Sequence, residues 1–255
     1  MISTSVLLFF TVLTGSAYGH VIKNDQKQHN QNVGIIDGHR IYIEQAPFMA
    51  SIRLYGLIHA CGGAIIHERF ILTSAQCAET NSYLKVYVGT RKIYEGGKAY
   101  DVVKNIKHEI YSVQTGDYDV GLLKLNESLT FGPTVAKVLL NEGTMLNVTG
   151  FGFTDPDNVF SNIVLRQATV PVIPKDLCMR YHYNFQVTQR MMCTNAMVND
   201  PCMGDEGGPL TWNNIQVGII SVRTGCGQLP TIYTDVKAVN QWIKKTIEKH
   251  DTEEK

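Results

Sequence analysis

The sequence lacks a charge imbalance and a long apolar run. Its 23 Lys and Arg residues equal its 23 Asp and Glu residues, so the formal net charge at pH 7 is zero. Without a basic stripe, we expect neither nucleic acid nor an anionic membrane as a partner. The longest apolar stretch, residues 5–14, is half the length of about 20 residues that a membrane-spanning helix needs. We therefore expect no transmembrane segment.

The sequence also lacks the cysteine spacings that are typical of metal sites. It contains six cysteines, but neither a CxxC pair nor a paired Cys/His spacing. Metal ligation is the alternative interpretation of these cysteines, and three disulfides are the prediction. Each disulfide would stabilise the fold by about 2–4 kcal/mol. We expect neither a metal nor another cofactor.

The N-terminus has the pattern of a secretory signal peptide. The apolar residues 5–14 are followed by Ala17-Tyr18-Gly19, a small-x-small cleavage pattern, so residues 1–19 are predicted to be the signal peptide. Residues 20–34 are polar and rich in Asn and Gln, which is typical of a leader without a packed core. We therefore expect a secreted, extracellular protein.

From Ile35 onward, short apolar or alternating segments recur. Gly, Pro, Asn and Asp separate them at intervals of about 8–15 residues. This spacing predicts an antiparallel β-barrel or β-sandwich. Only residues 235–249, DVKAVNQWIKKTIEK, have a helical period with apolar residues on one face. The fold class is therefore predicted to be all-β with one C-terminal α-helix.

Eight stretches between Ile35 and the final helix carry a family resemblance. In chain order they are IIDG (35–38), HACGGAII (59–66), ILTSAQC (71–77), DYDVGLLKL (117–125), GFG (150–152), CMGDEGGPL (202–210), SVRTGC (221–226) and PTIYTDV (230–236). The set resembles the chymotrypsin-like serine proteases. The resemblance implies two perpendicular six-stranded antiparallel β-barrels, residues 35–129 and 130–255, with the site in the cleft between them. It implies the disulfides Cys61–Cys77, Cys178–Cys193 and Cys202–Cys226.

The catalytic positions of that family are altered in this chain. In active members a serine attacks the substrate, a histidine accepts the serine proton, and an aspartate orients the histidine. By resemblance, Asp119 stands at the aspartate position, but Gln76 stands at the histidine position and Glu206 at the serine position. A carboxamide is not a base near neutral pH, and a carboxylate is a weak nucleophile. We therefore expect that the chain is not an enzyme but a proteolytically inactive homologue.

Two other interpretations of these positions remain. Asp119 and Glu206 could form a working carboxylate pair, although nothing else in the sequence supports such a site. Gln76 could instead be structural, with its two amide N–H groups holding one or both carboxylates. The resemblance also implies that the backbone N–H groups of Gly204 and Glu206 are the donors of the oxyanion hole.

The resemblance places Asp200 at the base of the primary specificity pocket of trypsin-like members. The walls of that pocket differ from the family pattern. Arg223 and Thr231 stand where the family has glycines, and Pro201 replaces a small polar residue. We expect the added side chains to close the pocket. Arg223 could pair with Asp200 or could turn to solvent.

The activation machinery of the family is also represented. Ile35 stands at the position whose freed ammonium group pairs with an aspartate, here Asp205, after cleavage. The preceding residue is Gly34 rather than Arg or Lys, so cleavage by a trypsin is not expected. His59 matches a histidine that holds this aspartate in family zymogens, and the alternative is a core histidine with a backbone partner.

Two sites fit the N-x-Ser/Thr pattern of N-glycosylation. The candidates are Asn126 and Asn147. Asn126 is expected to follow a strand, where a glycan is plausible, whereas Asn147 is expected to lie within a strand.

The mutated catalytic positions and the six cysteines resemble those of the inactivated serine protease paralogues of parasitic mites. That resemblance implies release into the gut lumen and binding to host defence proteins, notably complement components. The alternative is a non-catalytic regulator or decoy for an active serine protease or its inhibitors. A third possibility is an enzyme with a changed reaction.

Overall fold

The computed structural model describes residue 35 and residues 38–140, 145–153, 164–195, 199–222 and 225–252. All of these residues belong to one unit of the chain, residues 31–255. The predicted signal peptide and leader lie outside the described residues. Among the helices that are described, none is long and apolar enough to cross a membrane.

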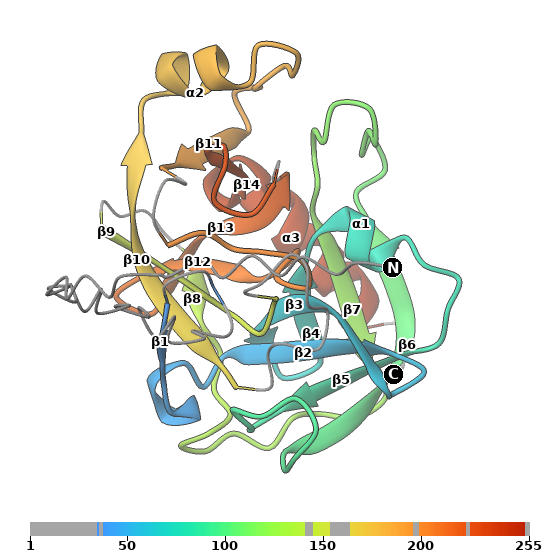
Figure 1. Ribbon diagram of the computed structural model, residues 1–255. Helices are drawn as coiled ribbons and strands as arrows, with labels where there is room; N and C mark the ends of the chain where they lie inside the picture. Colours follow the sequence, from blue (N-terminus) through green and yellow to red (C-terminus); the bar gives the residue numbers. More distant parts are fainter. Residues whose placement is uncertain are drawn as a thin grey trace, which may run out of the picture. The chain divides into compact units, whose positions relative to one another are not determined.

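Six antiparallel strands close into a first barrel in the order β2-β3-β4-β7-β6-β5 (Figure 1). They are β2 (Met49–Leu54), β3 (Ile58–His67), β4 (Phe70–Thr73), β5 (Leu84–Val88), β6 (Lys98–Lys107) and β7 (Gly121–Leu125). In β5, Leu84, Val86 and Val88 are buried, and the two residues between them are only half-buried. Because successive side chains of a strand point to opposite faces, this alternation directs the three apolar side chains into the barrel interior.

A second barrel forms from six later strands. Strand β10 pairs with both β9 and β11, so the path β9-β10-β11-β14-β13-β12 returns from β12 to β9 and closes. These strands are β9 (Met145–Gly150), β10 (Arg166–Ile173), β11 (Met191–Thr194), β12 (Pro209–Trp212), β13 (Ile215–Val222) and β14 (Thr231–Asp235). The short strand β8 (Leu139–Leu140) pairs in parallel with β13. The prediction of two six-stranded antiparallel barrels is confirmed.

The first described segment of the chain belongs to the second sheet. Strand β1 (His39–Arg40) pairs with β10, and the Arg166 guanidinium donates to the carbonyl of Gly38. Ile35 is fully buried in the core of the second barrel. The sequence assigned residues 35–129 to the first barrel, but Ile35 and residues 38–40 pack on the other one. Backbone pairing with β10 is the physical reason.

The helices are short except for the last one. They are the 3-10 helix η1 (Ile43–Gln45), α1 (Ala75–Ala78), α2 (Lys175–Tyr181) and α3 (Val236–Asp251). Asp235 caps α3, since its carboxylate accepts the N–H of Lys237 at 2.9 Å. The buried face of α3 packs against residues of β4 and β7 in the first barrel and of β13 in the second. The predicted C-terminal helix is therefore confirmed, and it joins the two barrels.

Three disulfides are present, and they have the predicted pairing. Cys61–Cys77 ties β3 to α1, and Cys178–Cys193 ties α2 to β11. Cys202–Cys226 ties the loop before β12 to the loop before β14. The described part of the chain contains no free cysteine.

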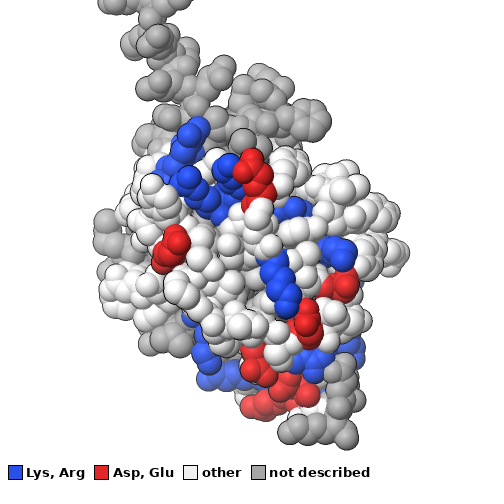
Figure 2. All heavy atoms as spheres, turned by 90° about the horizontal axis from the view of Figure 1, so that it is seen from below, with Lys and Arg blue, Asp and Glu red and all other residues white. Residues whose placement is uncertain are grey.

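Both signs of charge occur on the surface. In the face shown in Figure 2, Lys and Arg side chains are interspersed with Asp and Glu side chains, and neither sign covers the face. Several opposite charges are in contact, among them Lys98 with Glu127 and Lys85 with Asp101. Exposed pairs of this kind contribute about 0–1 kcal/mol each. They affect the surface charge pattern more than the stability of the fold.

Candidate functional site

Gln76 is presented by α1, a single helical turn that follows β4. Ser74 is the N-cap of the turn, and its hydroxyl accepts the N–H of Cys77 at 3.3 Å. The Cys61–Cys77 disulfide ties the same turn to β3. Gln76 is the exposed residue of the turn, whereas its other residues are buried. The turn therefore holds the Gln76 backbone in place and leaves the side chain accessible.

Asp119 is a buried carboxylate that Gln76 and Ser221 hold from two sides. Its Oδ1 atom accepts the backbone N–H of Gln76 at 3.0 Å. Its Oδ2 atom accepts the side-chain amide of Gln76 at 2.9 Å and the hydroxyl of Ser221 at 2.6 Å. Burial raises the pKa of Asp119, and the hydrogen bonds from Ser221 and Gln76 oppose that rise. The first barrel, α1 and β13 thus meet at one carboxylate.

The Gln76 amide uses both of its hydrogens in this network. Its nitrogen donates to Asp119 and also to the backbone carbonyl of Ser221, at 2.9 Å in each case. A primary amide nitrogen carries two hydrogens, so neither is left for another acceptor. The Oε1 atom of Gln76 is an acceptor only, and it is the part of the amide that remains for contacts outside the network.

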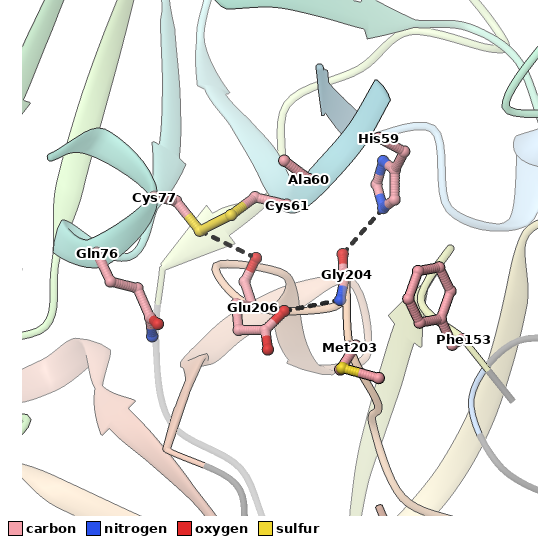
Figure 3. Close-up of a pocket in the computed structure, with 9 residues that line it drawn as sticks. All are labelled: His59, Ala60, Cys61, Gln76, Cys77, Phe153, Met203, Gly204 and Glu206. Carbon is pink, nitrogen blue, oxygen red and sulfur yellow. Dashed lines mark hydrogen bonds between the residues drawn. A yellow bond between two sulfur atoms is a disulfide. The ribbon is translucent and has the colours of Figure 1, made fainter. Parts of the chain in front are cut away.

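Glu206 lies in the glycine-rich loop that precedes β12. Gly204 and Gly207 have φ angles of 92° and 76°, a region that favours glycine. The backbone carbonyl of Glu206 accepts the N–H of Gly62 at 2.8 Å, which joins the loop to β3. The Glu206 carboxylate folds back on its own loop and accepts the N–H of Gly204 at 2.8 Å (Figure 3). One of the two N–H groups assigned to the oxyanion hole, that of Gly204, is therefore occupied by the Glu206 carboxylate.

Two hollows share Gln76 and Glu206 as lining residues. The first, shown in Figure 3, has a volume of about 360 Å³ and is also lined by His59, Ala60, Cys61, Cys77, Phe153, Met203 and Gly204. The second has a volume of about 450 Å³ and is also lined by Glu79, Tyr111, Val113, Gly116, Asp119, Phe185, Ser221 and Val222. We call the two hollows together the groove. It places the three catalytic positions of the family within one accessible region.

Asp200, at the specificity-pocket position, is enclosed rather than open. Its carboxylate accepts the hydroxyl of Thr231 at 2.5 Å and the N–H of Gly227 at 2.8 Å. Asp200 is 1% exposed, Thr231 is fully buried, and Pro201 is also buried. The Thr231 side chain thus occupies space beside the carboxylate, as its substitution for glycine predicts. Arg223 lies outside the described residues.

Asp205, at the activation-linked position, is bonded to backbone donors. One carboxylate oxygen accepts the N–H of Gly152 at 2.6 Å, and the other accepts the N–H of Cys202 at 2.9 Å. The buried Ile35 lies in the same region, because its side chain and the Asp205 carboxylate both lie near the position that a Cβ on Gly150 would take. The pairing of a freed Ile35 ammonium group with Asp205 stays a prediction.

His59 bonds to a backbone carbonyl rather than to Asp205. Its Nε2 atom lies 2.9 Å from the carbonyl of Gly204, and its Nδ1 atom lies 2.9 Å from the hydroxyl of Ser51. A carbonyl only accepts, so Nε2 carries the hydrogen and Nδ1 accepts from Ser51. Burial lowers the pKa of His59 to about 4. His59 is therefore a core histidine with a backbone partner, which was the alternative interpretation. It does not form the zymogen-type contact with Asp205.

The two glycosylation candidates have different surroundings. Asn126 is exposed directly after β7, as expected. Asn147 lies in β9 between two strands, where its side chain accepts the Thr169 hydroxyl at 2.9 Å and its carbonyl accepts the Thr211 hydroxyl at 3.2 Å. Only the surroundings of Asn126 suit a glycan. Glycosylation itself stays a prediction at both.

Ser221 and Ser51 are two hydrogen-bonded residues of the site that the sequence did not single out. Ser221 stands in the apolar strand IQVGIISV, and Ser51 stands in MASIRL. A lone hydroxyl residue inside a buried strand needs a hydrogen-bond partner, and that need is the signal that would have drawn attention to both. In the described residues, no group of three His, Cys, Asp or Glu side chains is placed to hold a metal ion.

The chemistry at these positions differs from that of the Ser-His-Asp arrangement. That arrangement moves a proton from a hydroxyl to an imidazole that an aspartate orients. Here the orienting carboxylate is present, but it is bonded to the amide of Gln76, and the carboxylate of Glu206 is bonded to Gly204. Asp119 and Glu206 are thus each held by different partners. Gln76 holds only the first of the two carboxylates.

Comparison with known proteins places the chain in a family. The family model described as Trypsin matches residues 35–243. Trypsin 5G1 of Aedes aegypti is 34% identical over 252 residues, which cover 93% of this chain and 94% of that protein. A trypsin of Simulium vittatum is 35% identical over 247 residues, which cover 90% and 99%. Trypsin delta of Drosophila melanogaster is 30% identical over 220 residues, which cover 82% and 87%.

These comparisons contradict the expectation that the chain is not an enzyme. Several relatives that match most of its length are named as trypsins. Gln76 and Glu206 stand at catalytic positions of the family by resemblance only, and two such positions do not by themselves take a chain out of the enzymes. Its fold, its disulfides and the match over residues 35–243 agree: the chain belongs to the trypsin-like family of serine proteases.

Proposed function

We propose that this member of the trypsin family acts by binding an extracellular protein, a segment of which lies in the groove. The observation that carries the proposal is the network at the centre of the groove. Gln76 is held by Asp119 and Ser221, and Glu206 is held by Gly204. The central polar groups are therefore fixed before any partner arrives. A preformed site loses less free energy to ordering when it binds.

The walls of the groove supply apolar contact area. Tyr111, Val113, Phe185 and Val222 line the second hollow, and Phe153 lines the first. Sites that hold a ligand are lined mainly by apolar and aromatic side chains, with a few polar groups that fix orientation. The groove has both kinds of group, in similar shares of its lining. An extended segment that crosses both hollows would contact the apolar walls and the central polar groups together.

The proposed location and partner follow from the sequence. The N-terminal pattern of a signal peptide and the three disulfides support secretion. The finer resemblance to serine protease paralogues of parasitic mites supports a host defence protein, such as a complement component, as the partner. A regulator of another serine protease is the alternative, and it differs in the identity of the bound protein.

The test is capture from mammalian serum by the immobilised protein, followed by identification of what is retained. The variant Val113→Trp fills the second hollow, because Val113 lines it and is 71% exposed. We expect Val113→Trp to lower retention of the specific partner by about tenfold, which corresponds to about 1.4 kcal/mol. The matched control is Val103→Trp, since Val103 is an exposed valine of β6 that does not line the groove.

Four outcomes separate the alternatives. Equal retention by wild type and Val113→Trp would show that the groove is not the binding surface. Recovery of the retained protein as shorter chains would make cleavage, not binding, its function. Inhibition of complement haemolysis by the wild type would support a complement partner, whereas a changed activation rate of a captured protease would support the regulator.

A further inference from the structure

We infer that the second sheet carries an anion site where β1 pairs with β10, and that Arg40 and Arg166 bind a doubly charged oxyanion there, such as phosphate or sulfate. The site lies apart from the groove, since neither arginine lines either hollow. It is independent of the proposed function, because its ligand belongs to another chemical class. The register of the strands, the burial of Arg166 and a neighbouring arginine support it.

Arg40 and Arg166 stand directly opposite each other on the two strands. The register of β1 and β10 pairs Arg40 with Arg166 and His39 with Gln167 (Figure 1). Residues opposite each other in an antiparallel pair have their side chains on the same face of the sheet, with Cβ atoms about 4.5–5.5 Å apart. Like charges in this arrangement destabilise the pairing of the strands. An anion bound by both guanidinium groups replaces this repulsion with attraction.

Arg166 is the buried member of the pair, and only 3% of it is exposed. Its Nη1 atom donates to the carbonyl of Gly38, while its Nε atom is buried without a hydrogen-bond partner. Burial, and secondly the positive charge of Arg40, lower the pKa of Arg166, and no carboxylate among the described residues opposes them. A buried charge without a counter-charge destabilises the folded state strongly. A bound anion supplies the counter-charge.

A third guanidinium group, that of Arg91, lies next to this pair. The backbone carbonyl of Arg91 accepts the N–H of Leu165 at 2.6 Å. The Arg91 guanidinium stacks over the Tyr42 ring, with 4.7 Å between its central carbon and the ring centroid. Leu165 immediately precedes Arg166, and Tyr42 follows Arg40 by two residues, so Arg91 flanks the pair on both strands. Its charge makes the local potential more favourable for an anion.

The chemistry of these side chains favours a doubly charged oxyanion. A guanidinium is planar, keeps its charge, and can donate two parallel N–H bonds to the oxygens of phosphate, sulfate or carboxylate. Two facing guanidinium groups carry two positive charges, which phosphate or sulfate neutralises and a single carboxylate does not. The nearby Lys92 already pairs with Glu95. Arg40 is exposed, so an anion can reach it from solvent.

The test is a phosphorus NMR titration of the full chain with inorganic phosphate at constant ionic strength and about pH 8, where phosphate is doubly charged. We expect saturable broadening of the phosphate resonance with a dissociation constant of about 1 mM. Arg40→Gln should weaken this binding about tenfold, because one of the two facing charges is lost. Since Arg40 is exposed, this variant should fold. A second titration with glycerol phosphate tests whether an esterified group also binds.

The matched control is Arg180→Gln. Arg180 is an exposed arginine of α2 that pairs with Asp176, so its variant removes the same charge from another place. We expect its affinity for phosphate to stay within about twofold of the wild type.

Thermal unfolding gives a second measurement through Arg166→Met. Phosphate at about ten times its dissociation constant should raise the wild-type unfolding midpoint by about 4 °C, because it binds the folded state. Arg166→Met should lose this rise. In phosphate-free buffer its midpoint should equal or exceed that of the wild type, since the substitution removes a buried charge without a counter-charge. Arg180→Gln again serves as the control.

Weaker phosphate binding in Arg40→Gln but not in Arg180→Gln would establish the site. Equal affinities for inorganic phosphate and glycerol phosphate would then assign it to an esterified group, and a preference for the inorganic ion would assign it to the free anion. No saturable binding, or equal binding by Arg40→Gln and the wild type, would overturn the inference. A midpoint rise that persists in Arg166→Met would also overturn it. None of these results bears on serum retention by the groove.

Discussion

Two carboxylates that the family pattern places in the site, Asp119 and Asp200, end in different surroundings. Each is capped by a hydroxyl from the second barrel, that of Ser221 on Asp119 and that of Thr231 on Asp200. Asp119 nevertheless lines the groove, whereas Asp200 lines neither of its hollows. Both residues are 1% exposed, so the two positions differ in whether a hollow borders them and not in the exposure of the carboxylate.

The kind of substitution explains the difference. By the resemblance, Thr231 stands where the family has glycine, and its side chain fills space beside Asp200. Gln76 exchanges one planar polar group for another of similar size, so the hollows beside it remain. The Thr231 side chain therefore encloses Asp200, whereas Gln76 leaves the hollows of the groove open and changes only which polar atoms line them.

The largest effect that separates the two carboxylates should be in stability. We expect Asp200→Ala to lower the free energy of unfolding by about 3 kcal/mol, because the Thr231 hydroxyl and the Gly227 N–H lose their acceptor in a buried place. We expect Asp119→Ala to cost about 1 kcal/mol, since water from the groove can replace the carboxylate. Urea unfolding at neutral pH, with the slope checked for each variant, measures the difference.

Equal costs for the two alanine variants would break the comparison. In that case water from the groove would not reach position 119, and the burial of Asp119 alone would set its contribution to stability. A smaller cost for Asp200 than for Asp119 would reverse the comparison. The isosteric pair Asp200→Asn and Asp119→Asn serves as the control for cavity formation, because neither variant removes side-chain volume.

The sequence predicted the fold because its signals are repeated along the chain. Alternating strands such as LKVYV, the helical period after Asp235 and the ordered motifs each indicate the same architecture. The family resemblance supplied the disulfide pairing, which spacing did not determine. The segment up to Arg40 was misplaced because a two-residue strand carries no periodicity that would reveal its partner β10.

The site was predictable in its positions but not in its contacts. The motifs located Gln76, Asp119 and Glu206, yet the second acceptor of the Gln76 amide, Ser221, lies 145 residues away in the chain. The same separation joins His59 to Gly204. Such contacts depend on how two barrels meet, which no local pattern encodes. The prediction that the chain is not an enzyme was wrong because it judged a whole chain from two positions.

The free energy of unfolding should also depend on pH through His59, which lines the groove. Burial lowers the pKa of His59 from 6.5 to about 4. The unfolded chain therefore binds more protons between these pH values, and stability falls as the pH falls through this window. Each pKa unit is worth about 1.4 kcal/mol, so His59 should remove about 3 kcal/mol by pH 4. Unfolding free energies measured from pH 7 to pH 4 test this.

The control for this titration must isolate His59. The pKa of Asp119 is raised by burial, so its contribution is lost as the pH rises and has the opposite sign. The measured quantity is therefore the difference between wild type and His59→Gln, and the exposed His39 provides the comparison variant His39→Gln. If wild type and His59→Gln have the same pH profile, the buried neutral state of His59 is not what limits stability in acid.

The next prediction by size of effect concerns ligand binding at the enclosed Asp200. We expect Thr231→Gly to bind benzamidine at least about tenfold more tightly than wild type, which should show no binding at millimolar concentration. The reason is that the Thr231 side chain bonds directly to Asp200 and stands where an amidinium would contact it. Thr231→Ser keeps that hydroxyl and should stay closed. Micromolar binding by wild type would show that Thr231 does not enclose Asp200.

The smallest effect concerns the amide that replaces the family's histidine. We expect Gln76→Ala to lower the free energy of unfolding by about 1 kcal/mol, because Asp119 and the carbonyl of Ser221 each lose a donor. The loss stays small because Gln76 is exposed and water can reach both acceptors. Gln114→Ala, which removes an exposed glutamine bonded only to Ser112 in its own loop, should cost less. If the two variants lower the free energy of unfolding equally, the Gln76 amide orients Asp119 without stabilising the fold.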